Sequence, residues 1–262
     1  MEQVKGLLID LDGTMYHGKH RIDGADDLIR KLRERKIPYL FVTNNSSRTP
    51  EQVAEHLGGM GIPATPEEVC TSSLAAASYI AHESPGAKVA ILGEEGLRSA
   101  LEDAGLELTE EIPKYVVQGI DRSFNYASLA KAVQWIRTGA VSVLTNPDLL
   151  LPSDTGLTPG AGSLGAAIEA ASGVKPIVIG KPSSILMKYA TDRLGITPAD
   201  AVVLGDNMRT DIAAGANAGC KTVLVMTGIT TDENMEEHMK AAGVTPDYVC
   251  RDLYEAAALL CG

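Results

Sequence analysis

Short apolar segments recur along the chain, and several of them are apolar at every position. Nine segments are predicted to be strands: 4–9, 39–42, 89–92, 115–117, 141–144, 177–179, 201–204, 222–226 and 248–250. Strands without polar alternation are typical of a parallel sheet that helices cover on both faces. Helical patterns lie between the strands, such as the buried stripe of Ala25, Leu28, Ile29 and Leu32. This alternation predicts an α/β fold with right-handed crossovers.

Polar side chains follow four of these strands, either immediately or after one glycine. They are Asp10, Thr43 with Asn44, Lys181, and Asp206. In open α/β sheets, ligands bind outside the carboxyl ends of the strands. We therefore expect the four strands to bring these side chains to one edge of a sheet, where they would form an active site.

The first acidic cluster is Asp10-Leu11-Asp12-Gly13-Thr14. Taken alone, it could be a helix cap or a solvated turn. A calcium loop is excluded because positions six and twelve, counted from Asp10, are Met15 and Arg21 instead of Gly and Glu. The second cluster runs from Gly205 to Asp211, and its first residues also suit a helix cap. Two such clusters together with a lysine at a strand end favour a site.

Taken in order, these residues resemble the motifs of the haloacid dehalogenase (HAD) superfamily of phosphotransferases: Asp10-x-Asp12-Gly-Thr14, Thr43, Lys181, and Gly205-Asp206 with Asp211. Segments 42–46, 145–148, 159–163 and 180–182 look like the NagD-type or p-nitrophenylphosphatase-like branch, subclass IIA. The resemblance implies a Rossmann-like core with three α/β/α layers, a mostly parallel sheet and an inserted α/β cap.

The spacing of the motifs predicts where the cap lies. Only 28 residues separate Thr14 from Thr43, which a flap around 15–24 and one helix would fill. In contrast, 137 residues separate Thr43 from Lys181, far more than one crossover needs. We therefore expect a core of residues 1–83 and 177–262 and a cap of residues 84–176, with a helix containing Leu129, Val133 and Ile136. The type IIA cap of the family occupies this position.

The resemblance also implies roles. Asp10 would be the nucleophile that forms an aspartyl-phosphate, and Asp12 would be the general acid and base. The implied phosphate contacts are Leu11, Asp12, Thr43, Asn44 and Lys181. The implied ligands of Mg²⁺ are Asp10, the backbone carbonyl of Asp12, and Asp206, with Asp211 and Asn207 holding metal-bound water. Asn146, Asp148 and Ser163 are candidates for substrate contacts from the cap, although turn and cap chemistry would also account for them.

Charge counting supports a cation at this site. The chain has 34 acidic and 23 basic residues and a net charge of −11, which excludes nucleic acid or an anionic membrane surface as a general partner. Asp10, Asp12, Asp206 and Asp211 would meet a phosphate of about −2 with one lysine to offset them. We therefore expect a divalent ion to be required, and chelation to abolish activity.

The expected function is hydrolysis of small phosphomonoesters, such as sugar phosphates, nucleoside monophosphates and, in vitro, p-nitrophenyl phosphate. Two alternatives stay open: a phosphotransferase or mutase with the same nucleophile, and a non-catalytic sensor of a phosphorylated ligand. The four cysteines form no CxxC pair, which favours a reduced, cytoplasmic setting. No apolar segment is long enough to cross a bilayer, and a homodimer is an expectation from the family alone.

Several weaker signals favour ordinary structural roles. Gly160-Ala161-Gly162-Ser163-Leu164-Gly165 matches GxGxxG, but segment 154–159 is predicted to be a loop and no acidic residue follows at the required distance. A helix start on the cap is favoured over a dinucleotide site. The basic run 30–36 is predicted to be the solvated end of a helix. His17 is expected to be a solvated flap residue, and Trp135 to pack along a helix.

Overall fold

The predicted strands form two parallel sheets in the computed structural model, which describes residues 4–153 and 156–262. All nine strands are present, within two residues of their expected bounds. The first sheet has the order β15-β14-β13-β1-β4-β5, with β1 paired in parallel to β13 and β4. Its strands are β1 (Gly6–Ile9), β4 (Tyr39–Thr43), β5 (Val69–Thr71), β13 (Ala201–Gly205), β14 (Lys221–Val225) and β15 (Tyr248–Cys250). The α/β expectation is confirmed.

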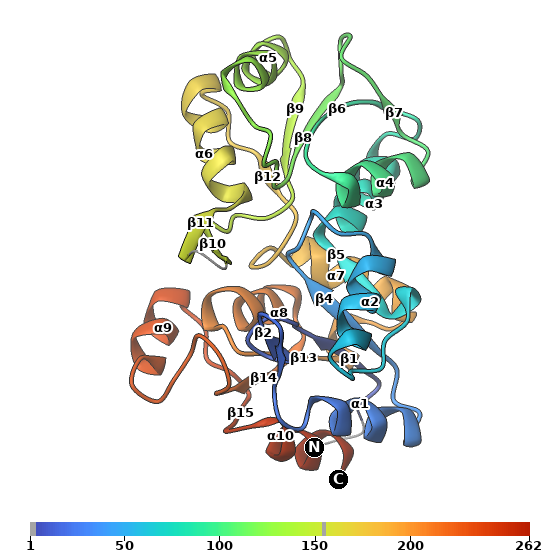
Figure 1. Cartoon of the computed structure of the whole chain (residues 1–262), viewed down its shortest axis with the longest axis vertical. Helices are drawn as coiled ribbons and strands as arrows, with labels where there is room; N and C mark the ends of the chain where they lie inside the picture. Colours follow the sequence, from blue (N-terminus) through green and yellow to red (C-terminus); the bar gives the residue numbers. More distant parts are fainter. Residues whose placement is uncertain (1–3, 154–155) are drawn as a thin grey trace. The chain divides into compact units, whose positions relative to one another are not determined.

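Helices cover both faces of this sheet. One face packs on α1 (Ala25–Glu34), α2 (Pro50–Gly59) and α10 (Leu253–Cys261), and Figure 1 shows α1 and α10 side by side. The other face contacts α7 (Ser184–Leu194), α8 (Ala213–Ala218), α9 (Met235–Ala242) and the π-helical turn Met208–Ile212. Successive residues of β14 divide between the layers: Val223 belongs to the first cluster and Leu224 to the second. This alternation explains why the strands are apolar throughout.

The second sheet has the order β12-β9-β8-β6-β7, and neighbouring strands in it run parallel. Its strands are β6 (Lys88–Leu92), β7 (Glu107–Leu108), β8 (Tyr115–Gln118), β9 (Val141–Leu144) and β12 (Ile177–Val178). The associated helices are α3 (Ser72–Glu83), α4 (Glu95–Asp103), α5 (Tyr126–Arg137) and α6 (Ala161–Ser172). The predicted helix around Val133 is α5, and Trp135 packs on its apolar cluster as expected.

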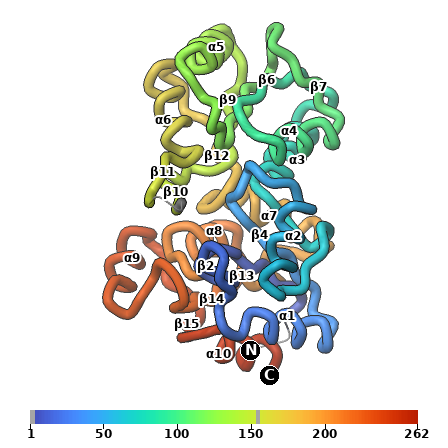
Figure 2. Tube along the Cα trace, in the orientation of Figure 1, coloured from blue at the N-terminus to red at the C-terminus, as the bar shows by residue number. Residues whose placement is uncertain are grey.

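Each sheet is the centre of one compact unit. The first unit contains the described residues through Thr43, Pro50–Cys70 and Lys181–Gly262, so it combines the blue and the orange-to-red parts of the chain in Figure 2. The second unit contains Asn44–Thr49 and Thr71–Gly180. The range expected for the cap, 84–176, lies inside the second unit, which also takes in α3 and the short segment after Thr43.

One strand lies in a different sheet from the one expected. The expectation placed 177–179 in the core, where its end would aim Lys181 at the same edge as Asp10. Instead β12 pairs with β9 in the second sheet, through Ile177 with Val143 and Val178 with Leu144. Only three of the four polar strand ends therefore belong to the first sheet. Lys181 is the first residue of the chain after its return to the first unit.

Two antiparallel hairpins add to the parallel sheets. The flap contains β2 (Tyr16–His17) and β3 (His20–Arg21). The second hairpin pairs β10 (Leu150–Ser153) with β11 (Gly156–Pro159). The loop expected at 154–159 is therefore wrong for 156–159, whereas Asp154 and Thr155 lie outside the described residues.

In the structure the GxGxxG match at 160–165 directly follows strand β11, contrary to the sequence prediction. However, β11 pairs antiparallel to β10 and does not enter a parallel crossover. A Cβ at Gly160 would lie 2.2 Å from the Asp148 carbonyl oxygen, and one at Gly162 would lie 2.2 Å from that of Pro147. The glycines therefore allow close packing of α6 on a neighbouring loop, which accounts for the motif without a dinucleotide.

The basic run 30–36 begins on α1 and continues past its end, and its first residues are paired with acidic neighbours. Arg30 bonds Asp27 and Glu34, and Arg33 bonds Glu68 at 2.8 Å. These are exposed or half-exposed contacts, as expected for a solvated helix end. Among the described residues, no helix is long and apolar enough to cross a membrane. Short 3-10 turns complete the fold at Pro66–Glu68 and Pro198–Asp200.

Candidate active site

The first acidic cluster and the strand-end lysine meet in the first unit. Asp10 follows β1, and its backbone N–H donates to the Leu204 carbonyl of β13 at 2.9 Å. The buried Lys181 ammonium donates to a carboxylate oxygen of Asp10, to Asp211 Oδ1 at 2.6 Å and to the Val42 carbonyl at 3.3 Å. Burial by itself would lower the pKa of Lys181, but the charges of Asp10 and Asp211 outweigh it and raise the pKa. Lys181 is therefore a permanent cation at this site.

Three buried aspartates converge beside this lysine. Asp10, Asp206 and Asp211 each offer a carboxylate oxygen, and these oxygens lie within 4.8 Å of one another. Burial, then the charges of Asp211 and Asp10, raises the pKa of Asp206 to about 8. Burial and Asp10 raise the pKa of Asp211 to about 6, although Lys181 opposes the shift. Since one lysine cannot neutralise three carboxylates, this group can hold a metal ion, and its all-oxygen donor set suits a hard divalent cation.

Asp211 lies closer to this group than the sequence analysis implied, because it was expected to hold only metal-bound water. The π-helical turn Met208–Ile212 carries it, and Asn207 caps that turn by accepting from the Arg209 N–H at 2.9 Å. The backbone N–H of Asn207 donates to Asp211 Oδ2 at 3.1 Å. In this structure the Asn207 side chain therefore acts as a helix cap, which was one of its two expected roles. The turn itself is π-helical, a geometry that is frequent at functional sites.

Thr14 and Gly13 bring the two acidic clusters close together. The Thr14 hydroxyl is fully buried and lies 3.2 Å from Asp10 Oδ2 and 3.3 Å from Asp206 Oδ1. Gly13 adopts φ of +90°, and a Cβ there would lie 2.5 Å from Asp206 Oδ2. Both the backbone conformation and the close approach therefore require glycine at this position.

Asp12 is exposed, whereas the three converging aspartates are buried. Partial desolvation and then the charge of Asp10 raise the pKa of Asp12, while His17 and His56 lower it less. Because its pKa is raised, the Asp12 carboxyl keeps its proton to a higher pH than an ordinary aspartate, as a proton donor must. His17 is an exposed flap residue, as expected, and its Nε2 lies 2.6 Å from the Thr227 carbonyl oxygen.

The remaining expected residues divide between the units. Leu11 is buried beside Asp10, and Thr43 is the last residue of β4. Asn44 begins the second unit, which also contains Asn146, Asp148 and Ser163.

The expected cap residues make contacts within the second unit. The Asn44 side-chain amide donates to the Asp148 carboxylate at 3.1 Å, and that of Asn146 donates to the Asn44 carbonyl at 2.9 Å. The Ser163 hydroxyl donates to the Leu149 carbonyl at 2.6 Å. The first two contacts attach the segment after Thr43 to the second unit.

The loop Thr227–Thr230, which follows β14, also contacts the site and was not predicted from the sequence. The Ile229 N–H donates to Asp206 Oδ2 at 2.7 Å, and the Thr227 hydroxyl donates to the Gly13 carbonyl at 2.8 Å. A signal was present, because β14 was predicted as a strand of the same parallel sheet and its end faces the same edge. The loop was overlooked because it carries no ionisable side chain.

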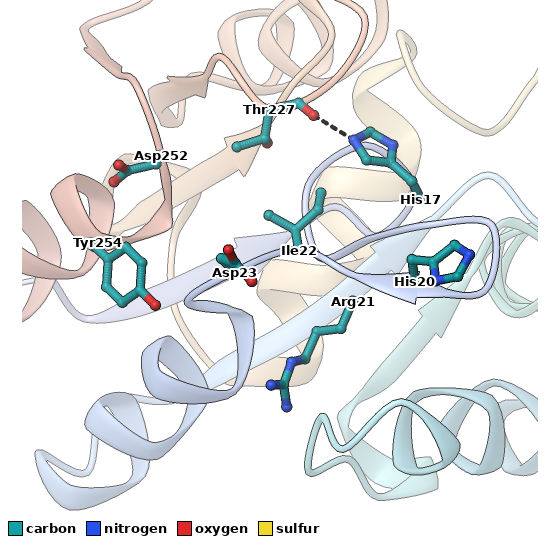
Figure 3. A pocket seen from close by; sticks show the side chains of 8 residues that line it. All are labelled: His17, His20, Arg21, Ile22, Asp23, Thr227, Asp252 and Tyr254. Carbon is teal, nitrogen blue, oxygen red and sulfur yellow. Dashed lines mark hydrogen bonds between the residues drawn. The ribbon is translucent and has the colours of Figure 1, made fainter.

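A separate open pocket of about 510 Å³ lies on the first unit beside the flap (Figure 3). Its lining residues are His17, His20, Arg21, Ile22, Asp23, Thr227, Asp252 and Tyr254. None of the three converging aspartates lines it. Among its lining residues, Thr227 contacts the site directly, because its hydroxyl donates to the Gly13 carbonyl at 2.8 Å.

Comparisons with known proteins agree with this geometry. Residues 7–107 match a family described as haloacid dehalogenase-like hydrolase, and residues 178–256 match one described as HAD-hydrolase-like. The chain is 48% identical over 240 residues to the 5'-nucleotidase YutF of Bacillus subtilis, covering 92% of this chain and 94% of that protein. It is 46% identical to an acid sugar phosphatase of Staphylococcus aureus, covering 99% of both chains. A solved p-nitrophenyl phosphatase from Archaeoglobus fulgidus superposes with a TM-score of 0.93 at 36% identity, covering 98% of this chain and all of that one.

Proposed function

The chain belongs to the haloacid dehalogenase-like hydrolase family, and on that premise we propose that it is a Mg²⁺-dependent phosphomonoester hydrolase acting through an aspartyl-phosphate. One observation carries the proposal. Asp10 is ion-paired to the buried Lys181 and shares its site with two further buried aspartates, Asp206 and Asp211. These carboxylates would repel a phosphate unless a divalent cation offset their charge, and Asp10 in this setting is placed as a nucleophile toward a phosphate held by that cation.

In the first step, an oxygen of Asp10 attacks phosphorus and the bond to the leaving oxygen breaks. Asp12 donates its proton to that oxygen, so the product leaves as an alcohol. The raised pKa of Asp12 supports this role, because the carboxyl must carry a proton when the substrate binds. We assign contacts with the phosphoryl oxygens to Thr43, to the backbone N–H groups of Leu11 and Asn44, and to Lys181.

In the second step, water attacks the phosphorus of the aspartyl-phosphate. Asp12, now a carboxylate, accepts the proton from this water, and the bond between phosphorus and Asp10 breaks to release inorganic phosphate. Lys181 balances the charge of Asp10 before and after the step. Mg²⁺ would be held by the carboxylates of Asp10, Asp206 and Asp211 and by the Asp12 carbonyl. The ion would offset the charge of the phosphate and of these carboxylates. Asn207 would lie near its bound water.

We propose that the second unit is the cap that selects the substrate, with 84–176 as its central part. Small sugar phosphates and nucleoside monophosphates are the proposed substrates, because the relatives carry the names of a 5'-nucleotidase and an acid sugar phosphatase. Asn146, Asp148 and Ser163 are the proposed specificity residues. A cytoplasmic setting and a homodimer are further parts of the proposal; four free, buried thiols support the first.

The test is release of inorganic phosphate from p-nitrophenyl phosphate and a panel of small phosphate esters, with Mg²⁺ and with excess EDTA. Asp10→Asn should abolish turnover, and EDTA should abolish wild-type turnover. One phosphate released per ester cleaved supports hydrolysis. Transfer to an acceptor without free phosphate would identify a phosphotransferase or mutase, and binding without turnover would identify a sensor. Full activity in EDTA or in Asp10→Asn would overturn the proposal.

A further inference from the structure

We propose that the loop Thr227–Thr230 is the positioning element of the metal site and sets metal affinity through Asp206 and the turn that carries Asp211. The inference rests on the proposed function, because it assigns a role toward the ion that those carboxylates would hold. The loop has no charged side chain, so it would act through hydrogen bonds and close packing alone.

Three contacts orient Asp206, and two of them come from the loop. The Ile229 N–H donates to Asp206 Oδ2 at 2.7 Å, while Thr14 lies 3.3 Å from the other oxygen. The Thr230 N–H donates to the backbone carbonyl of Asp206 at 3.2 Å. The carboxylate is therefore held at both oxygens and at its backbone, which fixes the direction in which it presents its lone pairs.

Gly228 makes the closest approach in this region. A Cβ at Gly228 would lie 2.0 Å from Asp206 Oδ2 and 2.5 Å from its carboxyl carbon. No side chain fits there unless the carboxylate moves. The loop backbone therefore forms one wall of the space in which Asp206 sits.

The same loop reaches the other two catalytic segments. The Thr230 hydroxyl accepts from the Met208 N–H at 3.2 Å, at the start of the turn that carries Asp211. The Thr227 hydroxyl donates to the Gly13 carbonyl at 2.8 Å, within the Asp10 loop. Four consecutive residues thus tie together all three segments that supply the aspartates.

The flap anchors the loop from its outer side. Figure 3 shows the His17 ring directed at the Thr227 carbonyl, at a distance of 2.6 Å. Thr227 is therefore held through both its hydroxyl and its carbonyl. Groups that orient metal ligands in this way typically change metal affinity by roughly 10- to 100-fold when they are lost.

The experiment measures Mn²⁺ binding without substrate, from the paramagnetic resonance signal of the free ion. Thr230→Val removes the acceptor for the Met208 N–H, and we expect its dissociation constant to rise by roughly 10- to 100-fold. Thr230→Ser keeps the hydroxyl and should bind like wild type. Gly228→Ala should lose more affinity than Thr230→Val. Excess metal should restore turnover in Thr230→Val, which a general folding defect would not allow.

Thr222→Val is the matched control. Thr222 is a buried threonine of the adjacent strand whose hydroxyl bonds Asp247 at 2.9 Å. Its loss should lower thermal stability but leave Mn²⁺ affinity unchanged. If wild type, Thr230→Val and Gly228→Ala all bound Mn²⁺ with equal affinity, the proposed role of the loop would be overturned. The proposed function would still stand in that case, provided that the wild type hydrolyses phosphate esters. An equal loss of affinity in Thr222→Val would also overturn it, and absence of Mn²⁺ binding by the wild type would overturn both proposals.

Discussion

Stabilisation by Mg²⁺ should depend steeply on pH, because the carboxylates that would hold the ion bind protons without it. The pKa of Asp206 is raised to about 8 and that of Asp211 to about 6 by burial and neighbouring charge. In the unfolded chain both carboxyls lose their protons near about pH 4. The metal-free folded protein therefore holds more protons than the unfolded chain between about pH 4 and pH 8, and its stability falls as the pH rises through that window.

The expected size of the metal effect follows from these values. At about pH 5.5 the ion must displace a proton from Asp206, which weakens its apparent affinity by roughly 100-fold relative to pH 8. At an ion concentration about 100 times the dissociation constant at pH 8, binding stabilises the fold by about 2.7 kcal/mol there and by about 0.4 kcal/mol at pH 5.5. For domains of roughly 150–250 residues, these correspond to shifts in Tm of about 5–10 °C and about 1 °C.

Thermal unfolding with Mg²⁺ and with EDTA, at both pH values, measures this difference. Asp206→Asn removes the carboxylate with the highest pKa and should lose most of the shift at pH 8. Asp192→Asn, an exposed position on α7 of the same unit, should keep the full shift. Equal Tm shifts at the two pH values, or no shift at pH 8, would refute the reasoning.

Three further predictions follow from the site and the fold. Lys181→Met leaves Asp10 and Asp211 buried without their cation, so urea denaturation should show a loss of about 3–5 kcal/mol; a loss below about 1 kcal/mol would contradict the buried pair. Asp12→Asn should lower kcat by roughly 10²- to 10⁴-fold in steady-state phosphate release, and a smaller loss would assign the proton transfer elsewhere. Gly162→Ala places a Cβ 2.2 Å from a backbone oxygen, and should cost about 1–3 kcal/mol by calorimetry, whereas a neutral result would reopen a ligand role for the glycines.

The strands and the identity of the buried carboxylates could be predicted from the sequence alone. Apolar segments with no polar alternation are typical of strands buried on both faces, and all nine predicted strands are present, although Tyr248 and Val249 of β15 are exposed. Asp10 and Asp206 were predicted to meet because each lies at the carboxyl end of such a strand, and their oxygens lie within 4.8 Å of each other. The exposed position of Asp12 could not be predicted, because it depends on how the flap folds back.

Features that depend on partners distant in sequence were not predicted. The two residues of β12 are equally apolar in either sheet, and only pairing with β9 decides between them. The hairpin strand β11 is mostly exposed and lacks the apolar pattern that marks a strand. The loop Thr227–Thr230 bonds Asp206 through backbone N–H groups, which every residue except proline possesses. No residue type could therefore mark Ile229 as the donor to Asp206.

The route of the chain between its two units limits how this enzyme can be re-engineered. The chain passes from one unit to the other after Thr43, Thr49, Cys70 and Gly180. The first and last of these crossings adjoin the phosphate motif and Lys181. A chimera that receives a foreign second unit must therefore join the two parents beside Thr43 and Lys181, or leave 44–49 without its native partners. If the second unit selects the substrate as proposed, loop grafts within Thr71–Gly180 are a more accessible route to altered selectivity than exchange of the whole unit.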